Sequence, residues 1–283
     1  MTHTIGLLHP GSMGSAVGAQ LRARGHIVLW CPAGRSDATR RRAELAGLEA
    51  EALPELVSRS DVLISLCPPA AAEETAAQVA ELGTAGVGTI YVEANAVSPS
   101  RAQRIADRLA PLAFIDAAVV GSPPVGGKYP TLYLSGPGKQ ALQIAGLFAG
   151  TDVRSHILGD GIGKASALKL AYSSYQKASR VLAAVAYGAA DSYGVADELL
   201  EIAAKRTRSY LVEIDYIPET AARAWRWGPE LDDAAALLAD AGLPDELMRA
   251  AAATLARWDG NRDERLDIAE ALEALRVEGD NPS

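Results

Sequence analysis

Cysteine, histidine and aromatic residues are scarce in this chain of 283 residues. Its two cysteines, Cys31 and Cys67, do not amount to the disulfide framework of a small secreted domain. The four histidines include no pair at metal-ligand spacing, and Ser122 and Ser173 lack the histidine and aspartate partners of a serine hydrolase. Apolar runs are short and interrupted, so none predicts a membrane span. With no signal peptide in the sequence, we expect a cytoplasmic protein.

Charge narrows the choice of partner. The formal net charge is −8 and the sequence pI is near 5.1, which disfavours long-range attraction to nucleic acid or to an anionic membrane. The hydrophobic content of 49% and the length allow a full core and two domains. A small-molecule substrate is the partner that this composition favours.

Short apolar runs alternate with stretches rich in alanine, arginine and glutamate over the first half of the chain. Strands are expected at Thr4–Leu8, Ile27–Cys31, Val62–Cys67, Thr89–Glu93, Ala113–Ala117, Thr131–Ser135 and Asp152–Ile157. Helices are expected at Ser12–Arg24, Ser36–Ala46, Pro54–Arg59, Ala70–Leu82, Ser98–Leu109 and Lys139–Ala149. Continuous apolar strands that alternate with helices are typical of parallel sheets covered on both faces. The pattern predicts a Rossmann-type, doubly wound α/β domain.

The pattern changes at the glycine cluster Gly159–Gly163, after which β-type runs vanish. A long helix is expected from Ala165 to about Tyr193, followed by shorter helices to about Val277. We therefore predict a cofactor-binding domain over residues 1–159 and an all-helical domain for substrate binding and dimerisation over residues 160–283. Apolar residues around most of the long helix indicate burial, within one subunit or against the partner of a homodimer.

A glycine-containing turn closes the first apolar run. Glycines at such a turn let the backbone approach a pyrophosphate, which the N–H groups and dipole of the following helix attract. The full fingerprint is G-x-G-x-x-G, and His9 stands where its first glycine belongs. The residues expected to bind the cofactor here are Pro10, Gly11, Ser12, Met13 and Gly14.

The end of the second strand favours NADP(H) over NAD(H). NAD-binding domains carry an acidic residue there for the ribose hydroxyls, but this strand ends without one and continues to Arg35 and Ser36. Both can hold a 2′-phosphate, and Arg40 lies one helical turn further on. In the alternative interpretation, Ser36 and Asp37 only cap a helix and the arginines only form a solvated face.

Five segments together resemble the β-hydroxyacid dehydrogenase family, which includes 3-hydroxyisobutyrate and phosphogluconate dehydrogenases. The segments are Ile5–Gly14, Leu66–Pro69, Glu93–Pro99, Asp116–Ser122 and Gly161–Lys169. The family turn reads G-L-G-x-M-G, so Gly11, Met13 and Gly14 match while His9 and Pro10 depart. The remainder of the chain resembles a divergent branch, often described only as phosphogluconate-dehydrogenase-like.

The resemblance implies roles for several further residues. The nicotinamide is expected near Cys67, Pro68 and Asn95. Asn95 and Ala96 replace the serine and threonine of the family's substrate loop, D-x-S-T-x-x-P, and Asn95 can donate to a carboxylate or contact the ribose. Gly121 and Ser122 remain for substrate binding in a motif whose family serine is lost. These departures point to an altered substrate.

The resemblance also places Lys169 at the family's catalytic lysine, with Tyr172 and Ser173 where the family has Asn-Asn or His-Asn. Positions i, i+3 and i+4 share one helix face, and Lys177 continues it two turns further on. An ammonium group can protonate the alkoxide that hydride addition forms at a carbonyl. We expect Lys169 and Tyr172 to be catalytic and Ser173 and Lys177 to bind substrate. In the alternative interpretation, Lys169 is a snorkelling surface residue.

The sequence thus predicts an NADPH-dependent oxidoreductase of a small carbonyl or hydroxy compound, such as a hydroxy acid or semialdehyde, with Lys169 as the proton relay. One alternative is an imine reductase on the same scaffold, which Tyr172 keeps open. Another is a non-catalytic NADPH-binding sensor or scaffold.

Overall fold

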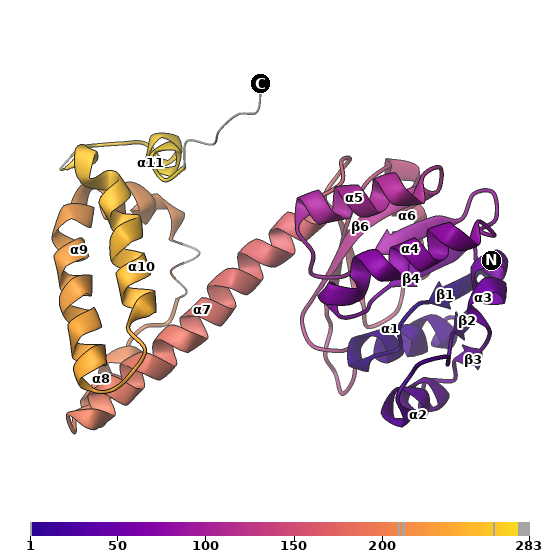
Figure 1. Cartoon of the computed structure of the whole chain (residues 1–283), viewed down its shortest axis with the longest axis horizontal. Coiled ribbons are helices and arrows are strands. Elements are labelled where there is room, and N and C mark those ends of the chain that lie inside the picture. The colour runs from indigo at the N-terminus through magenta and orange to yellow at the C-terminus, as the bar shows by residue number, and fades with distance from the viewer. Residues whose placement is uncertain (1, 209, 211–212, 263, 277–283) are drawn as a thin grey trace. The chain divides into compact units, whose positions relative to one another are not determined.

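The computed structural model describes residues 2–208, 210, 213–262 and 264–276. The chain divides into two compact units, Met1–Ser174 and Tyr175–Ser283 (Figure 1). The first is an α/β unit and the described part of the second is helical, so the predicted fold class is confirmed.

An eight-stranded sheet with the order β3-β2-β1-β4-β5-β6-β7-β8 forms the centre of the first unit. All neighbouring strands are parallel except the antiparallel pair β6 and β7. The strands are β1 (Thr4–Leu7), β2 (Ile27–Trp30), β3 (Glu49–Ala50), β4 (Val62–Ser65), β5 (Ile90–Glu93), β6 (Ala113–Val120), β7 (Thr131–Ser135) and β8 (Arg154–Ile157). The two-residue β3 was not expected, because its exposed Glu49 and Ala50 have no apolar pattern.

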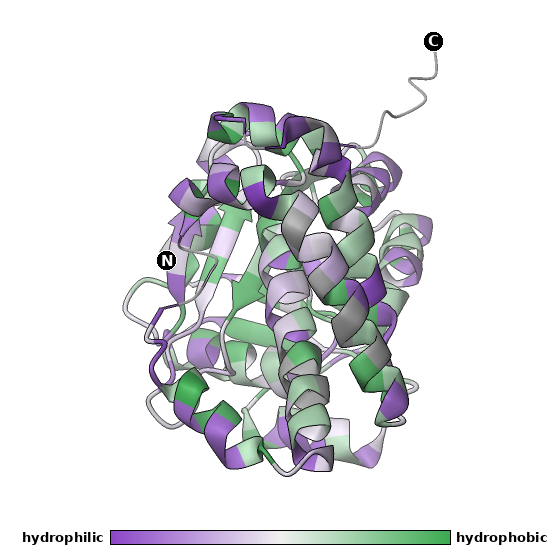
Figure 2. Ribbon diagram, turned by 90° about the vertical axis from the view of Figure 1, so that its left-hand side faces the viewer, coloured by the Kyte–Doolittle hydropathy of each residue, from purple (hydrophilic) through white to green (hydrophobic). Residues whose placement is uncertain are grey.

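Helices cover both faces of the sheet. They are α1 (Ser12–Ala23), α2 (Asp37–Leu45), α3 (Leu53–Arg59), α4 (Ala72–Leu82), α5 (Pro99–Leu109) and α6 (Gly138–Leu147), with the 3₁₀ turn η1 (Pro69–Ala71) before α4. In Figure 2 the strands are mostly in the hydrophobic colour, whereas the helices carry both colours. This contrast is expected when strands are buried on both sides and helices on one.

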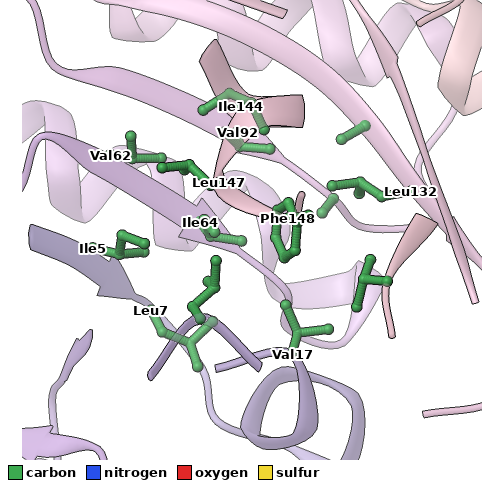
Figure 3. Close-up of a cluster of buried hydrophobic side chains, with 14 of the residues drawn as sticks. Ile5, Leu7, Val17, Val62, Ile64, Val92, Leu132, Ile144, Leu147 and Phe148 are labelled. Atoms are coloured by element: carbon green, nitrogen blue, oxygen red, sulfur yellow. The ribbon is translucent and has the colours of Figure 1, made fainter. Parts of the chain in front are cut away.

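Two hydrophobic cores result, one on each face. Strand residues such as Ile5 and Ile64 pack with Val17 of α1 and with Ile144 and Leu147 of α6 (Figure 3). On the opposite face, residues of α3, α4 and α5 pack on the alternate strand positions. Those strand positions are Leu29, Leu63, Tyr91 and Phe114. The alternation of strand side chains thus decides which helices each residue meets.

The sheet reverses its winding between β1 and β4, which are hydrogen-bonded neighbours although two strands separate them in sequence. In doubly wound sheets, ligands bind outside the carboxyl ends of the strands at such a switch point. His9–Gly14, which runs into the first turn of α1, follows β1, and Leu66–Pro69, which runs into η1, follows β4, so both predicted cofactor segments lie at this position.

Asp116 of β6 anchors the first turn of α7 (Lys164–Ser192). Its Oδ2 accepts hydrogen bonds from the backbone N–H groups of Gly163, Ala165 and Ser166 at 2.9–3.1 Å, and from the Ser135 hydroxyl at 3.0 Å. Its Oδ1 accepts a 2.6 Å hydrogen bond from the Ser166 hydroxyl. A fully buried carboxylate thereby satisfies N–H groups that a helix start leaves without partners.

The boundary between the compact units lies in α7 at Ser174/Tyr175, whereas the sequence places a domain boundary at Gly159. The chain does leave the sheet after β8, close to Gly159. The first turns of α7 nevertheless belong to the first unit, because Asp116 and Ser135 bind them. Lys169, Tyr172 and Ser173 therefore lie in that unit, and Lys177 lies in the second.

The second unit is helical throughout its described residues. After the remainder of α7 come α8 (Ala196–Ala204), η3 (Ile214–Tyr216), α9 (Ile217–Asp240), α10 (Glu246–Leu255), η4 (Ala256–Asn261) and α11 (Ile268–Ala274). Ala189 of α7 packs with Leu238 and Met248 in one small core, and Trp258 packs with Ala224 and Ala271 in another. The Trp258 indole donates to the Ala271 carbonyl at 2.9 Å, so this tryptophan is structural.

Replacement Asp116→Ala is expected to lower the free energy of unfolding by about 3 kcal/mol or more, because several buried donors lose their acceptor at once. Denaturant titration measures the change. Asp37→Ala, at the exposed first turn of α2, is the matched control, with an expected loss below about 1 kcal/mol. Equal losses in the two variants would contradict the anchoring role of Asp116.

Candidate active site

The β1–α1 turn leaves the start of α1 open. Gly11 is the N-cap, no side chain caps the helix and its first turn contains no acid. Gly14 is required by packing, because a Cβ there would overlap the carbonyl oxygen of His9. Pro10 is buried, Met13 is half-buried and Ser12 is exposed. The unsatisfied N–H groups and dipole of α1 therefore remain available to an anion.

Arg35 borders this turn from the end of β2. Its Nη2 donates to the carbonyl of Leu8 at 2.9 Å, and its buried Nε has no hydrogen-bond partner. Arg40 donates from Nε to the Arg35 carbonyl at 3.3 Å. Ser36 is the N-cap of α2 and accepts from the Thr39 backbone, as the alternative interpretation of this residue held. The arginines are thus held at the turn, while the Ser36 hydroxyl is occupied locally.

A buried polar cluster lies where β4 and β5 end. The Asn95 backbone N–H donates to Glu93 Oε1 at 3.1 Å, and the Asn95 amide group donates to the same oxygen. The Asn95 amide nitrogen also lies 2.9 Å from the Ser65 hydroxyl and 3.4 Å from Cys67 Sγ. These contacts point the Asn95 donor inward, and its acceptor Oδ1 is left without a hydrogen-bond partner. Asn95 is thus presented as an acceptor rather than as the donor expected for a carboxylate.

Glu93 is fully buried within this cluster. Removal from water raises the pKa of Glu93 to about 7, hydrogen bonds from Asn95 and Ser65 oppose the rise, and the nearby Asp116 adds to it. Its Oε2 is buried without a hydrogen-bond partner among the residues that the structure describes. Burial likewise raises the pKa of the Cys67 thiol, so Cys67 is a poor nucleophile.

Four buried polar side chains lie side by side across the sheet. Strand register pairs Ser65 of β4 with Glu93 of β5, Glu93 with Asp116 of β6, and Asp116 with Ser135 of β7. All four side chains are inaccessible to solvent. This row connects the Asn95 cluster to the start of α7, and we refer to it below as the polar row.

Lys169 lies on α7 one helical turn after Ser166. Its Nζ donates to the carbonyl of Val119 at 2.9 Å, and the residue is half-buried. Val119 precedes the end of β6 at Val120, which leads directly into Gly121 and Ser122. The structure thus brings the predicted catalytic lysine to the strand end that carries the predicted substrate-binding residues.

The other predicted substrate residues are distributed more widely. Gly121 has a φ of 124°, a conformation that favours glycine, and Ser122 is exposed. Tyr172 is 40% exposed and Ser173 is half-buried, both on the part of α7 that belongs to the first unit. Lys177 is exposed in the second unit, and Pro68 is exposed beside Cys67. Their roles stay predictions.

The residues present fit a nicotinamide dinucleotide. An uncapped helix start with glycines faces the switch point, and unpartnered buried polar atoms of Arg35 and Asn95 border it. No role is expected from the sequence for Glu93 or Asp116, although each is an acid within or directly after an apolar run, which signals a buried carboxyl group. Within the described residues, no group of acidic, histidine or cysteine side chains could hold a metal ion. No helix there is long and apolar enough to cross a bilayer.

Comparison with known families and proteins gives two domain matches. Residues 4–150, more than half of the chain, match the family described as the NAD binding domain of 6-phosphogluconate dehydrogenase. Residues 190–258 match a domain of unknown function (DUF1932). An uncharacterized 28.5 kDa protein encoded in the 7S RNA 5′ region of Methanothermus fervidus is 31% identical over 176 residues. That match covers 62% of this chain and 66% of the relative, just under two thirds of its length.

Solved structures of similar fold cover nearly the whole chain. An imine reductase of Streptomyces aurantiacus is 18% identical with a TM-score of 0.74, covering 97% of this chain and 100% of its own. A reductive aminase of Aspergillus terreus in complex with NADPH and ethyl levulinate is 21% identical with a TM-score of 0.72, covering 98% and 100%. A Mycobacterium tuberculosis 3-hydroxyisobutyrate dehydrogenase with L-serine is 21% identical with a TM-score of 0.62, covering 98% and 100%. At these identities the likeness is one of fold.

The raised pKa of Glu93 predicts a measurable pH dependence of stability. Because the folded protein retains a proton on Glu93 that the unfolded chain loses, this group makes the free energy of unfolding fall as pH rises from about 4.5 to about 7. Glu93→Gln is expected to remove up to about 1.4 kcal/mol per pH unit of that fall. Denaturant titrations across this pH range measure it, with the exposed Glu74→Gln on α4 as the control. Parallel curves for wild type and Glu93→Gln would refute the assignment.

Proposed function

Because this chain belongs to the family of the NAD-binding domain of 6-phosphogluconate dehydrogenase, whose members are nicotinamide-dependent oxidoreductases, we propose that it transfers hydride between NADPH and a small carbonyl or hydroxy compound. The observation that carries this proposal is the position of Lys169, whose ammonium group is held at the Val119 carbonyl beside the end of β6. A hydroxy acid or a semialdehyde is the substrate class that the sequence motifs favour.

NADPH rather than NADH is proposed from the surroundings of the β1–α1 turn. No carboxylate follows β2 directly, and the nearest acid, Asp37, is exposed in the first turn of α2. Arg35 is held beside Leu8, where a guanidinium can form charge-assisted hydrogen bonds to a 2′-phosphate. The open start of α1 would hold the pyrophosphate, and the Cys67 and Asn95 segment would border the nicotinamide.

The bound cofactor would supply the hydride. Residues of the chain would orient the substrate and donate a proton to it. When hydride adds to the carbonyl carbon, the electron pair of the C=O bond moves to oxygen. Lys169 donates a proton from Nζ to that oxygen and regains one from water, so the charge balances. The hydrogen bond to Val119 fixes Nζ for this transfer. Gly121, Ser122, Tyr172 and Ser173 of the first unit would orient the substrate.

Imine reduction is the second candidate. The solved imine reductase and reductive aminase have TM-scores of 0.74 and 0.72, against 0.62 for the hydroxyisobutyrate dehydrogenase. Tyr172 supports this alternative because its partly exposed phenol lies one turn from Lys169. A C=N bond also needs a proton donor beside it, so Tyr172 would replace Lys169 in that role.

Lys169→Ala is expected to lower kcat by about 10²–10⁴-fold while the Kd for NADPH stays within about twofold, because the lysine acts on the proton and not on the cofactor. NADPH oxidation with semialdehydes, hydroxy acids and cyclic imines, together with cofactor titration, measures both values. Lys164→Ala, an exposed lysine on the same helix, is the matched control.

The same assay separates the alternatives. Full turnover by Lys169→Ala would refute the relay, and faster turnover of cyclic imines that depends on Tyr172 would favour imine reduction. Tight NADPH binding without oxidation by any compound would instead indicate a sensor or scaffold.

A homodimer through the helical unit is part of the proposal. Leu182, Tyr193, Leu199 and Met248 are among the lining residues of an apolar groove of about 370 Å³ in that unit. Exposed apolar surface of this kind is typical of a protein interface. Light scattering is expected to give twice the chain mass of 29.5 kDa, and Leu182→Glu to give a monomer. Leu142→Glu, on exposed surface of α6, is the control, and a monomeric wild type would refute the dimer.

A further inference from the structure

His9 occupies the position of the missing first glycine and lies against the turn itself. Its carbonyl accepts a 3.0 Å hydrogen bond from the Gly11 backbone. A Cβ built on Gly11 would stand 3.2 Å from His9 Cδ2 and 3.3 Å from Nε2, so the imidazole lies directly over the start of α1. The substitution therefore adds an ionisable ring to the place where the fingerprint has none.

Positive charge acts on His9 from three parts of the fold. The start of α1 contributes the positive end of its dipole and no acidic residue in its first turn. Arg35 approaches from the β2–α2 turn and Arg42 from α2. Burial foremost, and then these two arginines, lower the pKa of His9 below its usual 6.5. Nδ1 of His9 and Nε of Arg35 are both buried, and neither has a hydrogen-bond partner in the described part of the chain.

We propose that His9 is a specificity-determining ligand of the cofactor, which takes up a proton when the 2′-phosphate of NADP(H) binds between its imidazole and Arg35. This inference rests on the proposed binding of NADP(H). Because the unpartnered Nε of Arg35 and the ring of His9 flank the same turn, one anion can satisfy both residues. The imidazolium then donates a charge-assisted hydrogen bond to a phosphate oxygen.

His9 is expected to gain a proton because the bound phosphate changes the electrostatic potential at the imidazole from positive to negative. A phosphomonoester brings a charge of about −1.5 to −2 at pH 7, which outweighs the neighbouring cations at hydrogen-bond distance and favours the imidazolium. Binding therefore raises the pKa of His9 from its lowered value, and the complex binds more protons than the free protein. By linkage, His9 makes NADP(H) affinity rise as pH falls through this interval. NAD(H) lacks the 2′-phosphate, so its effect is smaller.

The direct test follows the histidine C2–H signals by NMR, which is tractable because the chain has only four histidines. The loss of one signal in His9→Gln assigns His9. If that variant does not fold, separate variants of His3, His26 and His156 assign it by elimination. Saturating NADP⁺ is expected to raise the pKa of His9 by about 1 or more, and NAD⁺ by clearly less. An unchanged or lowered pKa with bound NADP⁺ would overturn the proposal.

A second measurement compares NADPH affinity in wild type and His9→Gln by fluorescence titration at pH 6 and pH 8. The 2′-phosphate itself titrates near pH 6, so only the ratio of the two proteins isolates His9. His9→Gln is expected to bind NADPH about tenfold more weakly at pH 6 and within about twofold at pH 8. The same ratio at both pH values would refute the proton uptake while leaving the oxidoreductase proposal intact. Absence of NADPH binding by the wild type would overturn both.

Discussion

The carboxylate of Asp116 is the interaction on which the first unit depends. It accepts hydrogen bonds from three backbone N–H groups at the start of α7 and from the hydroxyls of Ser135 and Ser166, all away from solvent. Because these hydrogen bonds hold the start of α7 against β6, they also fix the positions of the residues in its first turns relative to the sheet. Lys169 reaches the Val119 carbonyl for this reason. The candidate proton donor is thus positioned by the buried carboxyl group of another element, β6.

The starts of α1 and α7 differ in how the positive end of the helix dipole is neutralised. At α7 the chain provides its own anion, Asp116, and satisfies the helix internally. At α1 there is neither a capping side chain nor an acid in the first turn, so the positive end is left for a ligand. Arg35 increases the positive potential at that second start. The uncapped start of α1 and the close approach at Gly14 are retained although His9 replaces a glycine of the family turn.

Sequence patterns predicted most of the sheet because its strands are continuous apolar runs; β7 at Thr131–Ser135 coincides with its expected range. They missed β3, whose Glu49 and Ala50 are exposed, and they placed the domain boundary where the glycines are rather than where packing changes. For the candidate site, the sequence supplied residue identities, whose roles stay predictions, but it supplied no side-chain orientations. Asn95 turns its donor inward toward Glu93, two residues before it, and toward Ser65, which approaches it only in the folded sheet. The contact with Ser65 is tertiary, so local sequence does not reveal it.

The polar row of Ser65, Glu93, Asp116 and Ser135 also constrains how the sheet can assemble. Strand side chains alternate between faces, so a slip of β6 by one residue would move Asp116 into the opposite apolar layer and leave the start of α7 without its acceptor. The neighbouring Ile115 and Ala117 could pack in the apolar core on either face with a small loss of stability. Asp116 could not, because burying its carboxylate without hydrogen-bond partners costs much more free energy. Strands made of interchangeable aliphatic residues specify their alignment poorly. In this sheet the polar row specifies the alignment. Only the observed register keeps its buried side chains paired and keeps Asp116 at the start of α7.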